Sequence, residues 1–297
     1  MLREKDWHML DIPEGKINDY EISHDIKPPG TELRTSNMRT TLLGQQPGKI
    51  LKFGYETCWH KLSYDGGTWM TDLPIEQSQH DRELADFKGH VLVGGLGLGY
   101  AVTHLCRRPE INHVTVVEKS IEVVKLVEPY LKVPRGKLTV ITEDLFNYLR
   151  DMRPMYGGPA YDYCFYDIWQ SDGEHTLWEQ VVPLRKLTQE GDVCDDLYVI
   201  CWNEDVMRGQ LVFSMRSRLL WLDDRVKGLP KGDKRFQMPT LENMCEKRDD
   251  IYWDWMVPFW RSYRDDEFSK EELMDFAGRY CAIVGKPGWE QGWQDLV

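Results

Sequence analysis

The chain has 297 residues, enough for one large domain or for a domain with a smaller addition. Hydrophobic residues make up 41% of it, so it can bury a full core. Its 49 acidic residues outnumber 37 lysines and arginines, and a formal net charge of -12 argues against bulk electrostatic binding to nucleic acid or to anionic membranes.

Cysteine usage and the first residues indicate a compartment. The seven cysteines are an odd number, with no CxxC pair and no histidine at metal-ligand spacing, so we expect reduced thiols and no metal site. The opening "MLREKDWHML" carries charges where a signal peptide needs an apolar run, and no apolar run approaches the roughly 18 residues of a membrane span. These features predict a soluble, cytoplasmic protein.

Residues 1–85 are predicted to form a β-rich extension. A Pro/Gly-rich opening, "PPGTELRT", is followed by β-like segments at 49–55, 58–64 and 68–72. The last two flank Asp65-Gly66, a pair that favours the positive φ angles of a two-residue hairpin turn. We therefore expect a hairpin at this point.

Residues 86–205 alternate between short apolar strands and helical segments. The strand candidates are "HVLVGG", "HVTVVE", "KLTVIT", "YDYCFYD" and "DLYVICW". Because parallel strands are buried on both faces, they appear as continuous apolar runs separated by helices. The pattern predicts an α/β fold, a Rossmann-like parallel sheet with helices on both faces.

Residues 206–297 are predicted to be a helical region. Apolar residues recur every three or four positions from Met207 to Val226, and Ser269 to Glu272 form a capping box. The excess of basic residues over 203–235 indicates a solvated helix face or a site for an acidic substrate or nucleic acid. Seven of the 12 tryptophans follow residue 200, which predicts a helical cap or a partner surface, with a homo-oligomer left open.

Three glycines lie between the first strand and the first helix of the α/β region. Gly95, Gly97 and Gly99 permit a tight turn and close approach of a ligand, and the next helix directs free N–H groups toward it. Glu118 ends the second strand, where a carboxylate can accept hydrogen bonds from ribose hydroxyls. Tyr100 stands where a dinucleotide motif needs a small residue. The alternative is a tight turn that binds nothing.

The segments "VLVGGLGLG", "VTVVEKS" and "VITEDLFNYL" resemble the motifs of class I S-adenosylmethionine (SAM) dependent methyltransferases over residues 89–202. The resemblance implies SAM as the cofactor, held by the three glycines and by Glu118. It also implies that Asp144, with Leu145 beside it, faces the adenine amino group. Glu143 is the rival candidate, and Asp144 is also predicted to be a helix N-cap.

Asp167, in "YDYCFYDIW", is predicted at the carboxyl end of the fourth strand, where open α/β sheets place their chemistry. An Asp at this place in the spermidine synthase branch, whose β-rich extension is similar, deprotonates or orients the attacking amine. The resemblance therefore implies a catalytic and cofactor-adjacent Asp167. The alternative is a strand-end cap.

Two acids of that branch are missing, because Gly97 and Gln170 stand at their positions. We therefore expect methyl transfer to a small-molecule acceptor. An aminopropyltransferase, a nucleic-acid methyltransferase and a non-catalytic SAM-binding protein are the alternatives.

Further substrate candidates are Trp169, Gln170, Glu76, Gln77 and His80. A cation over an indole face is favourable, which suggests a ligand role for Trp169. The alternatives are a core or loop anchor for Trp169 and a solvated loop residue for His80.

Overall fold

The computed structural model describes residues 10–34, 50–152, 160–170, 176–195, 198–204 and 206–207. The chain divides into one unit of residues 1–172 and 183–206 and a second of residues 173–182 and 207–297. The predicted helix after Met207, the capping box and most of the basic and tryptophan-rich segments lie outside the described residues. Of the second unit, the π-helix η3 (Leu177–Val181) is described.

A five-stranded parallel sheet is the centre of the first unit. Its strand order is β11-β10-β7-β8-β9, and every neighbouring pair is parallel. The strands are β7 (Gly89–Gly94), β8 (Ile111–Glu118), β9 (Leu138–Thr142), β10 (Tyr163–Tyr166) and β11 (Val199–Cys201). The order reverses between β7 and β10, and in open α/β sheets ligands bind beside such a reversal, at the carboxyl ends of the strands.

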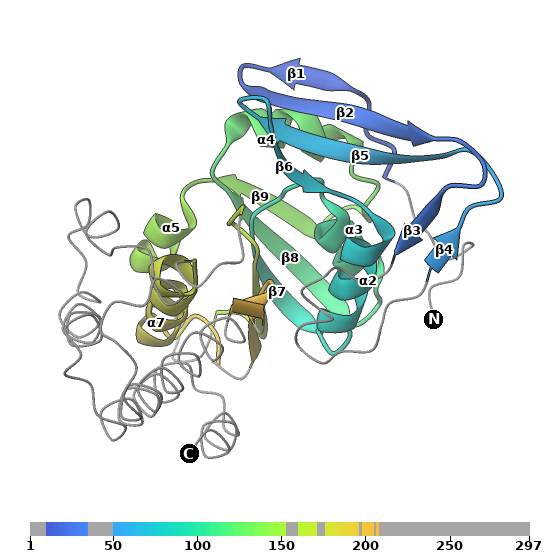
Figure 1. Ribbon diagram of the computed structural model, residues 1–297. Coiled ribbons are helices and arrows are strands. Elements are labelled where there is room, and N and C mark those ends of the chain that lie inside the picture. Colours follow the sequence, from blue (N-terminus) through green and yellow to red (C-terminus); the bar gives the residue numbers. More distant parts are fainter. Residues whose placement is uncertain are drawn as a thin grey trace, which may run out of the picture. The chain divides into compact units, whose positions relative to one another are not determined.

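Helices cover this sheet and confirm the predicted Rossmann-like class. In Figure 1, α5 and α7 lie on one side of the sheet and α2 and α3 on the other. The helices that follow strands are α3 (Tyr100–Arg107), α4 (Ile121–Val127) with the 3-10 turn η2 (Glu128–Tyr130), α5 (Leu145–Asp151) and α7 (Val182–Glu190). The apolar residues Val91, Leu92 and Val93 of β7 are all buried, as a strand covered on both faces requires.

The residues before the parallel sheet form antiparallel strands. A four-stranded sheet has the order β1-β2-β5-β6, and β3 pairs with β4. The strands are β1 (Gly15–Ile17), β2 (Tyr20–Lys27), β3 (Glu32–Arg34), β4 (Ile50–Lys52), β5 (Thr57–Tyr64) and β6 (Gly67–Thr71). The predicted hairpin is confirmed, because Asp65 and Gly66 have φ angles of 47° and 74° between β5 and β6.

Helix α2 (Pro74–Glu83) connects the two sheets and was not predicted. It begins with Pro74, whose fixed φ suits the first helical turn. Its carboxyl end is held by the guanidinium of Arg108, which donates to the carbonyls of Leu84, Ala85 and Phe87. The helix therefore packs beside α3, which ends just before Arg108.

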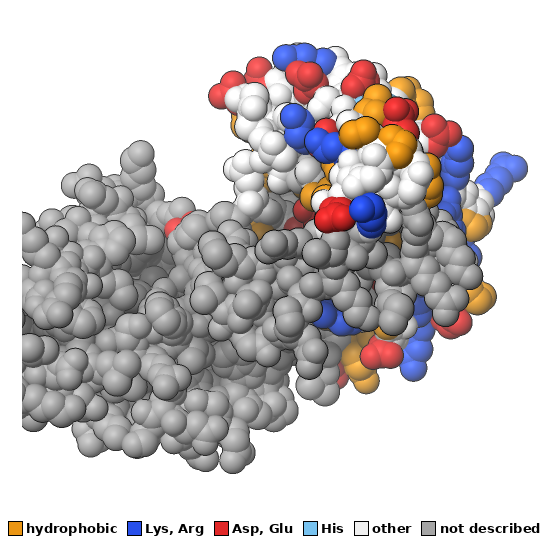
Figure 2. Space-filling view, turned by 45° about the vertical axis from the view of Figure 1, so that its right-hand side comes forward, with side chains coloured by type: hydrophobic (Ala, Val, Ile, Leu, Met, Phe, Trp, Pro, Cys, Tyr) orange, Lys and Arg blue, Asp and Glu red, His pale blue; other side chains and the backbone are white. Residues whose placement is uncertain are grey.

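The described surface carries charges of both signs. On the face in Figure 2, acidic and basic side chains of the described residues are interspersed with apolar ones. None of the helices in the described part of the chain has the length and apolar character that a membrane crossing requires.

Candidate functional site

The glycine loop between β7 and α3 adopts backbone conformations that only glycine adopts without strain. Gly95, Gly97 and Gly99 have φ angles of 93°, 51° and 78°. A Cβ on Gly95 would collide with the backbone carbonyl of Asp167, so the loop packs tightly on the segment after β10. A Cβ on Gly97 would collide with the thioether sulfur of Met70 in β6. The loop is thus enclosed by two other parts of the chain.

Glu118 holds this loop from the end of β8. Its Oε2 accepts a hydrogen bond from the backbone N–H of Leu96 at 2.9 Å, and its Oε1 accepts from the N–H of Ser120 at 2.8 Å. Each carboxylate oxygen can accept a further bond, so the predicted contact with ribose hydroxyls is compatible with this arrangement. The structure adds a second role for Glu118, the positioning of the loop, which the sequence did not suggest.

Asp144 is the N-cap of α5, as one of its two predicted roles requires. Its carboxylate accepts from the N–H groups of Phe146 and Asn147 and lies 3.0 Å from Nζ of Lys119. Burial alone would raise the pKa of Asp144. Lys119 and the helix N–H groups together lower it by more, so the net shift of the pKa is downward. The adenine role stays a prediction.

The two neighbours of Asp144 differ from it. Leu145 is buried and fills the space beside Gly94, where an added Cβ would collide with it. The carboxylate of Glu143 makes no hydrogen bond or ion pair with any residue that the structure describes. Glu143 therefore has more acceptor capacity left for a ligand than Asp144.

Asp167 lies directly after β10, at the carboxyl edge of the sheet. Its backbone N–H donates to the carbonyl of Gly94 at 2.9 Å, which places it beside the glycine loop. Its side chain is 20% exposed, and Oδ2 lies 3.8 Å from Nε2 of His80. The carboxylate is thus accessible and has a basic neighbour.

His80 is a buried residue of α2, so the alternative of a solvated loop residue is wrong. It is 5% exposed, its ring stacks on Trp202 at 4.0 Å, and the edge of the ring meets Phe165. Its Nδ1 lies 2.8 Å from the carbonyl oxygen of Glu76. Burial, the largest single influence, lowers the pKa of His80, but Asp167, together with Glu76 and Glu83, raises it, and the net shift is upward.

Glu76 and Gln77 contribute to the same side of the site. Oε1 of Glu76 accepts from the hydroxyl of Thr71 at 2.9 Å, and burial raises the pKa of Glu76 to about 7. Gln77 is 2% exposed, and its amide donates to the carbonyl of Asp72 at 3.0 Å. Gln77 therefore holds the start of α2, and its predicted contact with a substrate stays untested.

Trp169 and Gln170 continue the segment after Asp167. Trp169 is buried, and its indole N–H donates to the carbonyl of Trp202 at 3.2 Å, which is the arrangement expected of a loop anchor. The amide of Gln170 is exposed and donates to the carbonyl of Thr68 in β6 at 3.1 Å. Together with Met70 over Gly97, this contact brings β6 across the carboxyl ends of β7 and β10.

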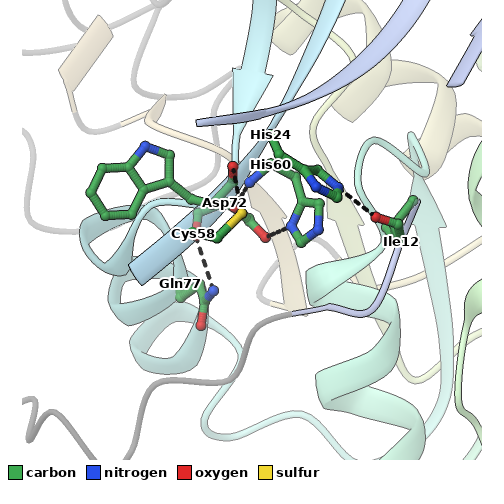
Figure 3. A network of polar contacts seen from close by, with 7 residues as sticks. Ile12, His24, Cys58, His60, Asp72 and Gln77 are labelled. Carbon is green, nitrogen blue, oxygen red and sulfur yellow. Dashed lines mark hydrogen bonds and ion pairs between the residues drawn. The ribbon is translucent and has the colours of Figure 1, made fainter. Parts of the chain in front are cut away.

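A buried pair that the sequence analysis missed, His60 and Asp72, lies where the chain passes from β6 to α2 (Figure 3). Nδ1 of His60 lies 2.7 Å from Oδ2 of Asp72, and the N–H of His60 donates to Oδ1 at 2.6 Å. The ring of His24 meets the ring of His60 edge to face, and Nε2 of His24 lies 2.8 Å from the carbonyl oxygen of Ile12. No local pattern marks these residues, because they come from separate strands.

Comparisons with known proteins give structural matches alone. No family model and no curated protein matches the chain. Precorrin 8w decarboxylase from Methanobacterium thermoautotrophicum is 14% identical, with a TM-score of 0.29 over 39% of this chain and 55% of that one. A putative O-methyltransferase from Klebsiella pneumoniae is 16% identical, with a TM-score of 0.30 over 39% and 52%. Human methyltransferase-like protein 13 in complex with SAH is 15% identical, with a TM-score of 0.30 over 41% and 58%.

The chain thus spans about half the length of these three proteins.

Proposed function

We propose that the chain is a class I SAM-dependent methyltransferase, of the spermidine synthase-like branch, that acts on a small-molecule acceptor in the cytoplasm. One observation carries the proposal. The glycine loop, the carboxylate of Glu118 that holds it and the accessible carboxylate of Asp167 meet at the carboxyl ends of adjacent parallel strands. This is the place where open α/β sheets bind nucleotide-like ligands.

The residues present fit a nucleoside cofactor. Glycines carry no side chain, so a ligand can approach the backbone of the loop closely, and the remaining acceptor capacity of Glu118 suits ribose hydroxyls. Glu143 or Asp144 would face the adenine. When bound, SAM supplies an electrophilic methyl group on a sulfonium.

Asp167 is the residue that we expect to act on the acceptor. Its carboxylate can accept a hydrogen bond from an acceptor N–H or O–H and so fix the direction of attack. When the acceptor must lose a proton, the same oxygen can take it. Neither role requires the two further acids that would hold a diamine, and Gly97 and Gln170 stand in their places.

Calorimetry with SAM, S-adenosylhomocysteine and NAD tests the cofactor. We expect both sulfur compounds to bind and NAD not to bind. Tight NAD binding with no heat from either sulfur compound would overturn the proposal. Methylthioadenosine as product, formed from decarboxylated SAM and putrescine, would instead identify an aminopropyltransferase. Salt-dependent binding of DNA or RNA would favour the nucleic-acid alternative.

Asp167→Asn tests the role of the carboxylate. The substitution keeps the shape of the side chain and removes its charge and basicity. We expect unchanged affinity for S-adenosylhomocysteine and a turnover lowered by roughly 10²-fold on an acceptor found by screening amines and hydroxylated metabolites. Loss of cofactor affinity with little change in turnover would place Asp167 in the cofactor site instead.

A further inference from the structure

We propose that His80 is the positioning residue for Asp167: its Nε2–H faces one oxygen of the carboxylate and leaves the other oxygen for the acceptor. The inference rests on the proposed function in one respect, the role of Asp167 toward an acceptor. The pairing itself is a property of the folded chain and can be measured without any cofactor.

The orientation of the imidazole is set by its other nitrogen. Nδ1 lies 2.8 Å from the carbonyl oxygen of Glu76, one helical turn earlier. A carbonyl oxygen can only accept, so Nδ1 carries the hydrogen and donates it. Nε2 is thereby directed at Oδ2 of Asp167, at 3.8 Å. A neutral ring in this orientation would turn a lone pair toward a carboxylate, whereas a protonated ring presents an N–H to it.

Packing prevents the ring from turning away. It stacks on Trp202 with an angle of 13° between the planes, and it meets Phe165 edge to face and Tyr100 at a tilt. These contacts come from the segment after β11, from β10 and from α3. A ring enclosed in this way has one fixed direction for Nε2, which is what a positioning residue needs.

The charges around the ring favour its protonated form. The groups that face it are the carboxylate of Asp167 after β10, the carbonyl and the carboxyl group of Glu76 and the charge of Glu83 in α2, and the phenol of Tyr100 in α3. A buried imidazolium is costly without a partner, and Asp167 is the partner at ion-pair distance. A histidine with a packing role alone would not need this charge.

Histidine NMR of the full chain measures the pairing directly. We expect the titration midpoint of the His80 ring to fall by about one unit or more in Asp167→Asn, because an opposite charge at this distance shifts a pKa by that order. Asp81→Asn is the matched control. Asp81 lies 3.1 Å from Nδ1 of His104 and accepts from the hydroxyl of Tyr100 at 2.7 Å, so its loss removes a nearby negative charge that is not paired with His80 and should leave the midpoint of His80 nearly unchanged.

Two outcomes of the NMR experiment would overturn the proposal. One is a His80 midpoint that is the same in wild type and in Asp167→Asn. The other is a midpoint that moves equally in both variants. Asp167→Ser serves as the second variant if the asparagine protein does not fold. Calorimetry with S-adenosylhomocysteine on the same samples tests the proposed function separately, because the NMR titration does not depend on it.

Turnover gives a second measurement. We expect His80→Phe to lower kcat by about tenfold or more while the affinity for S-adenosylhomocysteine stays the same. His80→Gln keeps an N–H that can reach toward Asp167, so it should recover part of the loss. Equal kcat values in wild type and His80→Phe would overturn the positioning role.

Discussion

The two sides of the candidate site are built in different ways. The glycine-loop side, Gly94–Gly99 with Glu118, is held by backbone geometry and backbone N–H groups. The β6–α2 side, residues 67–83, is held by side chains: Thr71 bonds Glu76, and His80 stacks on Trp202. The first side is therefore sensitive to added atoms, most of all at Gly95, whereas the second responds to charge and pH.

The largest effect is expected for Gly95→Ala. The added Cβ would collide with the carbonyl of Asp167, and φ at this position is 93°. Backbone strain and overpacking together should lower the free energy of unfolding by about 3 to 4 kcal/mol. Urea unfolding measures the loss.

Gly136→Ala is the control for this comparison. Gly136 also has a positive φ, 81°, but an added Cβ there meets nothing within 4 Å. The free energy of unfolding of Gly136→Ala should therefore fall only by the cost of backbone strain, about 1 kcal/mol. Equal losses in the two variants would show that the tight packing of the glycine loop on Asp167 does not matter for stability.

The next effect depends on pH and concerns Glu76. Its pKa of about 7 in the folded protein exceeds the ordinary 4.5, so between these values the folded state binds more protons than the unfolded state. The neutral carboxyl group of Glu76 therefore contributes stability at low pH, and this contribution is lost as the pH rises from about 4.5 through about 7. Glu76→Gln stays neutral, so at pH 8 it should raise the free energy of unfolding by roughly 3 kcal/mol.

The pH series is the check on this prediction. Near pH 4.5 the carboxyl group of Glu76 is protonated in the folded protein, and the advantage of the glutamine should shrink below about 0.5 kcal/mol. Urea unfolding of both proteins from pH 4.5 to pH 8 measures the difference. An advantage of the same size at every pH would mean that Glu76 is not held in its neutral form.

The smallest effect is expected on ligand affinity. Glu118→Ala removes an acceptor of ribose hydroxyls and also releases the N–H of Leu96 in the glycine loop. We expect the affinity for S-adenosylhomocysteine to fall by about tenfold to a hundredfold, since such bonds contribute on the order of 1.5 to 3 kcal/mol. Calorimetry measures it.

Glu122→Ala controls for the loss of a nearby negative charge. Glu122 lies in the first turn of α4 and accepts hydrogen bonds from Asn18 and Ser120. Its removal should leave the affinity unchanged. Unchanged affinity in Glu118→Ala as well, in a folded protein, would mean that the ribose is held elsewhere.

The glycine-loop side could be predicted from the sequence because its signals are local. The apolar run of β7, the three glycines and the acid at the end of β8 lie within one β-α-β segment. The hairpin at Asp65-Gly66 is local for the same reason. In each case a few adjacent residues determine the backbone conformation.

The β6–α2 side could not be predicted in the same way. Helix α2 has the sequence "PIEQSQHDRE", and its buried residues are Pro74, Gln77 and His80. A helix whose buried face is polar shows no hydrophobic periodicity. The pairs His80 with Asp167 and His60 with Asp72 join separate elements, so only the folded chain brings them together. The strands β1, β2 and β3 were not predicted either.

The contact between Met70 and Gly97 makes the residue type at position 97 depend on the residue type at position 70 in related sequences. Its thioether fills the space into which a side chain at position 97 would project. A relative that carries an acid at position 97 therefore needs another rotamer of this methionine or a shorter side chain at position 70. We expect substitutions at these two positions to covary, because the methionine must move or be replaced before a side chain fits at position 97.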